Sequence, residues 1–163
     1  TPMPDTTNDI IHDIIQREGP PTNDPLDKGG RTAFGISERA NPEAWADGKV
    51  TQEEAYAIYT AKYVKFPKFD VIPDEALKIQ LIDFGVTSGP QLAIQKLQAV
   101  LGVEQDGVLG PITLAALAAR DSREVNNALV SARVLMICRL VQKKPDQLKF
   151  LAGWCSRCLE FVQ

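Results

Sequence analysis

Apolar residues recur at intervals of three and four along most of the chain, the spacing that lines one face of an α-helix. The first such stripe comprises Ile10, Ile11, Ile14 and Ile15. It predicts a helix over about 6–18, which Gly19 and the two prolines after it end. Residues 19–36 follow no helical period, so they are predicted to be irregular, with room for at most a short hairpin around Thr32–Ile36.

Start and stop signals for helices divide the rest of the chain. Thr51 and Glu54 form a capping box, and Asp121 with Glu124 repeats the signal. A proline opens two further segments, a position that suits its fixed φ. The predicted helices cover about 41–45, 51–66, 74–86, 90–101, 111–120, 121–144 and 146–162. The fold class is therefore mainly α, a single helical domain with one loop-rich region near its start.

The composition suits one folded domain and argues against two classes of partner. Of the 163 residues 44% are hydrophobic, but no apolar run reaches the ~18–20 residues that span a bilayer, so we expect no membrane insertion. The net charge of −3 argues against general nucleic-acid binding. Residues 1–119 carry 10 Lys/Arg against 17 Asp/Glu, whereas residues 120–163 carry 8 against 4. The basic C-terminal part suits either an anionic polymer or a solvated helix face.

Three cysteines, Cys138, Cys155 and Cys158, imply no disulfide framework because one is left unpaired. Two of them form a C-x-x-C pair, but the single histidine, His12, lies more than a hundred positions away. One helical stripe contains Leu148, Leu151, Cys155, Cys158 or Leu159, and Val162. Because cysteine packs as a small hydrophobe, we interpret the pair as core and predict no metal site and no cofactor.

The irregular region holds two carboxylates, Glu18 and Asp27, on backbone stiffened by proline. Glu18 is expected at the C-terminal end of a helix, where the dipole and partial burial favour the protonated form that a general acid needs, although Arg17 opposes this. Two glycines after Asp27 let the chain turn, so this acid can lie across a cleft from Glu18, with the Thr32 hydroxyl steadying it or orienting a water. Carboxylates paired across a sugar are typical of glycoside hydrolysis.

Alternatives stay open for both acids. Carboxylates in Pro/Gly loops also serve as turn formers and helix caps. Asp24, within the turn signal Asn23-Asp24-Pro25, is a rival to Asp27 for the role of second acid.

The same stretch resembles a signature of glycoside hydrolase family 108, the bacterial and phage N-acetylmuramidases. The matching residues are Glu18-Gly19, Asn23-Asp24-Pro25, Asp27–Thr32 and Phe34–Ser37. The resemblance implies that Glu18 is catalytic. The order Glu, Asp, Thr is also similar to the catalytic trio of phage-type lysozymes, which implies roles for Asp27 and Thr32. Further substrate contacts are implied for Asp24, Gly30, Phe34, Thr87 and Trp154.

The likeness extends along the chain. Residues 83–86 are similar to the middle of the family, residues 97–117 resemble a peptidoglycan-binding motif, and Gly153-Trp154 with Arg157 matches its closing G-W-x-x-R. We therefore expect one lysozyme-like domain with a catalytic part at 1–89 and a helical part at 90–163. The segment at 97–117 either contacts glycan or stem peptide, or simply forms a tight turn between two helices, the interpretation that we favour.

The chain also departs from the family pattern. Pro20 and Pro21 replace a glycine and a tyrosine, and Thr87 stands where the family usually has asparagine. Proline fixes φ and removes a backbone N–H, so the loop after Glu18 is expected to follow a different path.

The resemblance implies hydrolysis of the β-1,4 bond between N-acetylmuramic acid and N-acetylglucosamine in peptidoglycan, with its glycan strands as the partner. Two other classes are a non-catalytic peptidoglycan-binding protein and an assembly protein of a phage or secretion apparatus. The first residues form no secretory signal, so we expect synthesis in the cytoplasm and action on the cell wall after release or export. The sequence distinguishes neither a phage lysin from a secreted effector nor one oligomeric state from another.

Overall fold

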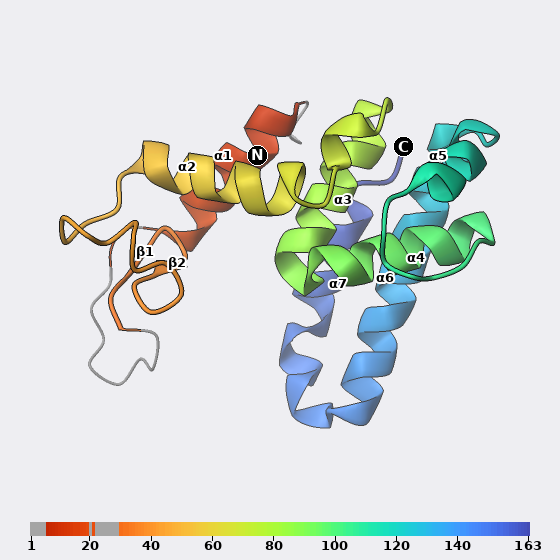
Figure 1. The fold of residues 1–163 in the computed structure, drawn as a ribbon. Coiled ribbons are helices and arrows are strands. Elements are labelled where there is room, and N and C mark those ends of the chain that lie inside the picture. Colours follow the sequence, from red (N-terminus) through yellow and green to blue (C-terminus); the bar gives the residue numbers. More distant parts are fainter. Residues whose placement is uncertain (1–5, 20, 22–29) are drawn as a thin grey trace.

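The chain folds around a central helix, as the computed structural model in Figure 1 shows. The structure describes residues 6–19, 21 and 30–163. The helices are α1 (Thr7–Glu18), α2 (Gln52–Thr60), α3 (Glu75–Ser88), α4 (Pro90–Leu101), α5 (Pro111–Ala118), α6 (Ser122–Lys143) and α7 (Leu151–Leu159). A single short hairpin of β1 (Thr32–Ala33) and β2 (Ile36–Ser37) is the sheet of the described residues. The predicted mainly α, lysozyme-like fold class is thus confirmed.

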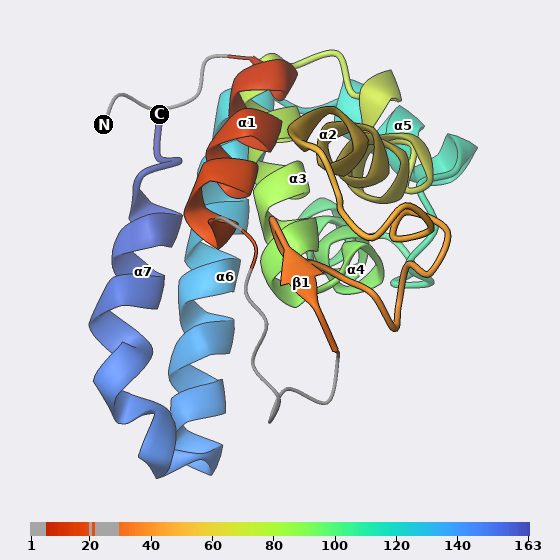
Figure 2. The ribbon, with the colours of Figure 1, turned by 90° about the vertical axis from the view of Figure 1, so that its left-hand side faces the viewer.

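Helix α3 is the centre of this arrangement. Its residues from Ile79 to Gly85 are all buried, which is typical of a helix that is covered on every side. Helices α1, α4 and α6 pack against it, and the four isoleucines of α1 supply one part of that core. Figure 2 shows α1 and α2 beside α3 in one part of the molecule and α6 with α7 along another.

Helices α6 and α7 form an antiparallel pair whose turn extends beyond the other helices in both views (Figures 1 and 2). The predicted continuous helix over 146–162 is wrong, because Pro145–Phe150 forms a 3-10 turn and α7 begins only at Leu151. Proline cannot donate to the preceding helical turn, and the tight 3-10 turn brings the chain back along α6. This shift leaves Leu148 and Val162 more than half exposed, whereas Cys158 is buried as expected.

The predicted short helix at 41–45 is also wrong. Single hydrogen bonds from Ala44 N to Asn41 O (3.1 Å) and from Trp45 N to Pro42 O (3.2 Å) make consecutive turns there. The buried Trp45 indole donates to Ile36 O (3.2 Å), which ties these turns to the hairpin instead of letting a helix propagate. The other predicted helices agree with the structure to within about two residues, except that the predicted 51–66 helix continues after Thr60 as a π-helical turn over Ala61–Lys65.

None of the helices among the described residues is both long enough and apolar enough to cross a membrane.

The turn between α4 and α5 is organised by one buried amide, that of Gln98. Its Nε2 donates to Asp106 Oδ1 (2.7 Å) and Thr113 Oγ1 (3.1 Å), and its Oε1 accepts from Gly107 N (2.9 Å). Gly107 has φ +76°, which suits the sharp turn. Asp106 and Gly107 therefore form a turn that is held from within the domain.

Replacing Gln98 with leucine should lower the free energy of unfolding by about 2–3 kcal/mol, because the buried turn loses its polar partner. Gln95→Leu makes the same chemical change on a less buried position of α4 and should stay within about 0.5 kcal/mol of the parent. Urea unfolding of the two variants measures the difference. Equal losses would contradict a special role for the Gln98 amide.

Candidate active site

Glu18 is the last residue of α1, as predicted, and the hairpin is attached directly to this helix end. Gly19 N donates to Ile15 O (3.3 Å) and caps the helix, while Gly19 O accepts from Phe34 N (3.1 Å). The backbone bond between Gly19 and Phe34 therefore fixes the hairpin beside Glu18.

The hairpin turns through Phe34 and Gly35, because Ala33 pairs with Ile36 across a two-residue loop. Both turn residues have positive φ, +51° at Phe34 and +77° at Gly35, as a type I′ turn requires. Positive φ is uncommon for a residue with a side chain, and such strained residues cluster at functional sites. The strained Phe34 lies next to the candidate acid.

Gly35 is the point at which α1, the hairpin and α2 meet. A Cβ atom at this position would lie 2.4 Å from the Tyr59 hydroxyl and 3.1 Å from Cγ of Glu18. Tyr59 comes from α2, and its hydroxyl donates to Phe34 O (3.0 Å). Only glycine therefore allows Glu18 and Tyr59 to approach the turn so closely.

Burial raises the pKa of Tyr59 to about 12, and the negative charge of Glu18 and the neighbouring Tyr63 add to the rise. The Tyr59 phenol is therefore neutral at physiological pH and keeps the proton that it donates to Phe34 O. This neutral phenol adds no charge beside Glu18.

Replacing Gly35 with alanine should destabilise the fold by about 2–5 kcal/mol, since it combines the cost of positive φ with a clash against Tyr59 and Glu18. Gly48→Ala is the matched control: Gly48 has φ +85°, but an added Cβ would make only an ordinary 3.6 Å contact with Arg31. The control should lose about 1–2 kcal/mol. Thermal unfolding of both variants checks the difference, and a control that loses as much as Gly35→Ala would contradict the close approach.

The partial burial expected for Glu18 is wrong, because its side chain is exposed. Among the described residues the hairpin approaches it at Gly35, and the end of α1 from Gln16 to Glu18 is exposed. Arg17, the residue before Glu18, forms an ion pair with Asp13 one turn earlier.

The other predicted residues of this region are placed unequally. Asp24 and Asp27 lie outside the described residues, so the candidate second acid stays a prediction. Thr32 is half-buried in β1 and pairs with Ser37. Gly30 is exposed with φ +75° and lies before the hairpin. Of the predicted set, the structure brings Phe34 next to Glu18.

The ion pair between Arg31 and Glu38 at the base of the hairpin was not predicted. The Arg31 guanidinium makes two bonds to the Glu38 carboxylate, of 3.0 Å from Nε and 2.7 Å from Nη2, and it also lies 5.0 Å from the Trp45 ring centre. The ion pair raises the pKa of Arg31 and lowers that of Glu38. The signal that could have found it was a pair of opposite charges directly before β1 and directly after β2, where the two residues face each other.

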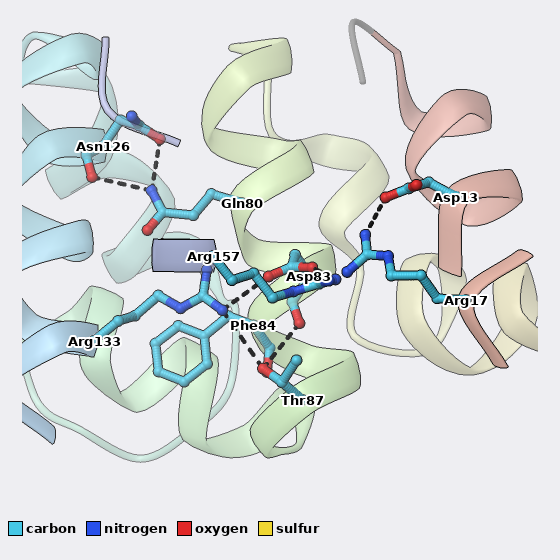
Figure 3. A network of polar contacts seen from close by, with 9 residues as sticks. All are labelled: Asp13, Arg17, Gln80, Asp83, Phe84, Thr87, Asn126, Arg133 and Arg157. Carbon is cyan, nitrogen blue, oxygen red and sulfur yellow. Dashed lines mark hydrogen bonds and ion pairs between the residues drawn. The ribbon is translucent and has the colours of Figure 1, made fainter. Parts of the chain in front are cut away.

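Thr87 and Trp154 lie in a second place, a pocket of about 190 Å³ between α3, α6 and α7. Thr87 Oγ1 donates to the α3 backbone at Asp83 O (3.1 Å) and Phe84 O (3.2 Å), as Figure 3 shows in part. These two predicted residues thus line the same pocket.

Asp83 is fully buried and holds two guanidinium groups from helices that are distant in sequence (Figure 3). Its Oδ2 accepts from Arg133 Nη2 of α6 (2.9 Å), and its Oδ1 pairs with Arg157 of α7. Burial raises the pKa of the Asp83 carboxyl, and the Arg133 guanidinium opposes that rise. The sequence offered Asp83 and Arg157 only as motif positions and gave no signal for Arg133.

Comparison with known proteins agrees with this geometry. Residues 11–89 match the family described as Glycosyl hydrolase 108, and residues 92–159 match a family described as Predicted Peptidoglycan domain. A solved structure described as that of Brucella abortus SagA is 30% identical, covering 94% of this chain and 93% of that chain with a TM-score of 0.66. The chain belongs to the glycosyl hydrolase 108 family. A comparison with curated proteins gave no match.

As a glycosyl hydrolase 108 protein with a peptidoglycan domain, the chain is a glycoside hydrolase whose substrate class is peptidoglycan. The first match contains Glu18 and the hairpin, and it ends just after Thr87. The second contains both arginines that contact Asp83. The buried Asp83 ion pairs therefore join the parts of the chain that the two families match.

Proposed function

We propose that this glycosyl hydrolase 108 protein is a muramidase, which cleaves the β-1,4 bond from N-acetylmuramic acid to N-acetylglucosamine in bacterial peptidoglycan. The observation that carries the proposal is the position of Glu18, a carboxyl at a helix C-terminus, held beside a strained hairpin turn by Gly35 and Phe34. The site of action is the bacterial cell wall.

Glu18 would act as the general acid that protonates the glycosidic oxygen as the bond breaks. Because the Glu18 side chain is exposed, a polymeric glycan strand can reach its carboxyl. The nearby Tyr59 phenol stays neutral and donates to Phe34 O, so it adds no charge beside Glu18.

A second group must stabilise the positive charge that develops on the sugar or activate the attacking water. We assign that role to Asp27, with Asp24 as its alternative, and assign the positioning of the water to Thr32. A carboxyl separation of ~6.5–9.5 Å would give inversion, and ~5–5.5 Å would give retention. Gly30 and Phe34 would contact the sugar on the hairpin side of Glu18.

The experiment that tests the proposed bond is product analysis. Purified peptidoglycan is digested, the new reducing ends are reduced with borohydride, and the sugar alcohols are identified by mass spectrometry. A muramidase yields the alcohol of N-acetylmuramic acid. The alcohol of N-acetylglucosamine would assign the enzyme to the other glycosidic bond, and no product from a folded protein would favour the binding-only alternative.

A further inference from the structure

The pocket between α3, α6 and α7 combines apolar walls with buried positive charge. Its polar lining residues are Thr87, Ser88, Arg133 and Arg157, and its apolar walls include Met136, Leu140 and Trp154. The Trp154 ring stacks on Phe150 with centroids 5.3 Å apart, which fixes one wall. The cavity of about 190 Å³ has room for a group the size of a small organic acid.

The charges around this pocket do not balance. Two guanidiniums, of Arg133 and Arg157, face one carboxylate, that of Asp83. Arg17 does not change the balance, because Asp13 neutralises it. A proton on Asp83, which its burial favours, would only increase the positive excess. Uncompensated buried charge is costly, so the pocket favours an anion.

Each of the two arginines also has a buried hydrogen-bond donor without a partner among the described residues. Arg133 is 2% exposed, yet its Nη1 has no hydrogen-bond partner among the described residues, and the same holds for the buried Nε of Arg157. The Arg133 guanidinium lies 4.7 Å from the Phe84 ring centre and 5.6 Å from that of Phe161, which holds it in place. A buried donor without a partner costs stability, so a ligand that brings an acceptor to these arginines would be favoured.

We infer that this pocket is a carboxylate-binding subsite, formed by Arg133 and Arg157 at its base and Met136, Leu140 and Trp154 around the body of the ligand. Arginine suits a carboxylate because its planar fork matches the two oxygens. The apolar walls suit an organic acid better than a hydrated inorganic anion. Naming peptidoglycan as the source rests on the proposed function. Its carboxylates belong either to the peptide stems or to the lactyl group of stem-free muramic acid.

Binding is measured by two-dimensional NMR of the tryptophan indole N–H groups, so it is independent of cleavage. The Trp154 signal reports the pocket, and the Trp45 signal is an internal control because its indole is buried and bonded to Ile36 O. N-acetylmuramic acid and an L-alanyl-D-glutamate peptide supply the two kinds of carboxylate. N-acetylglucosamine supplies a sugar without charge. Ionic strength is kept constant.

Either carboxylated ligand should shift the Trp154 signal in a saturable manner, while N-acetylglucosamine should not. A response to N-acetylmuramic acid alone would assign the lactyl carboxylate, and a response to the peptide alone would assign the stem. No saturable shift with either acid, or an equal shift with the neutral sugar, would overturn the inference. Because cleavage is not the readout, an inactive protein that binds the acids would overturn only the proposed function.

Two variants test the charge directly. Met136→Glu places a carboxylate in the pocket wall and should weaken binding at least about tenfold more than the near-isosteric Met136→Gln, which loses the same apolar contact but adds no charge. Arg157→Gln should also weaken binding about tenfold or more, with Arg133 left to balance Asp83. Equal affinities for Met136→Glu and Met136→Gln in folded proteins would overturn the inference.

Discussion

Replacing Glu18 with glutamine should lower the rate of reducing-sugar release from purified peptidoglycan by at least about 100-fold, the scale of general acid catalysis. Glutamine keeps the shape of the side chain and its contact with Gly35, but it has no acidic proton to give to the leaving oxygen. The loss should appear in kcat, because the contacts that bind the glycan are unchanged.

The fold of Glu18→Gln should be as stable as the parent or more stable by about 0.3–1 kcal/mol, because a negative charge leaves the C-terminal end of α1. A fall in activity together with equal or higher stability therefore excludes unfolding as the cause. Glu160→Gln is the matched control, since Glu160 is an exposed glutamate at the C-terminal end of α7. It should keep full activity.

A Glu18→Gln variant that retained more than a tenth of the parent activity would remove Glu18 from the proposed role. In that case another carboxyl of the irregular region at 19–36 would have to be the general acid. An inactive parent and an inactive variant, both folded, would favour the peptidoglycan-binding alternative.

Local signals explain why most of the helices could be predicted. Gly19 ends α1, and the capping box of Thr51 and Glu54 begins α2. In the structure the Thr51 hydroxyl accepts from Glu54 N (3.2 Å), as the box requires. Pro90 and Pro111 open α4 and α5 where expected. Each of these start and stop signals involves residues within four positions of each other, so it can be recognised directly in the amino-acid sequence.

The errors arose where the wider structure overrides the local pattern. The apolar stripe beyond Pro145 continues at helical spacing, but the chain must reverse there so that α7 can pack on α6. The Trp45 indole bond to the hairpin has the same effect on 41–45. Periodicity records which residues prefer a helix, and it does not record where the chain has to turn.

The candidate site was predictable only in part, for a related reason. Glu18 could be found because a helix end and a family motif coincide in one short stretch. Its neighbour Tyr59 is 41 positions away, and their approach depends on the single Gly35 between them. The grouping of Arg133 and Arg157 on Asp83 spans 50 and 74 positions. Such contacts follow from the packing of whole helices, which no local pattern describes.

Replacing Asp83 with asparagine should lower the free energy of unfolding by about 3–5 kcal/mol. The variant keeps the size of the side chain but leaves the guanidiniums of Arg133 and Arg157 buried together without a counter-charge. In a chain of this size the melting temperature should fall by about 6–20 °C.

Asp70→Asn makes the identical chemical change in an exposed ion pair, in which Asp70 lies 3.0 Å from Lys65 and the two side chains are 39% and 64% exposed. It should cost less than about 1 kcal/mol, because water already solvates both charges. Adding Arg133→Met to Asp83→Asn should cost less than the sum of the two single losses, since the second change removes the charge that the first left unpaired. Strict additivity, or an Asp83→Asn variant as stable as Asp70→Asn, would mean that Asp83 is not the counter-charge of the arginines. The Asp83 ion pairs would then no longer explain how the part of the chain that carries Glu18 is held to α6 and α7.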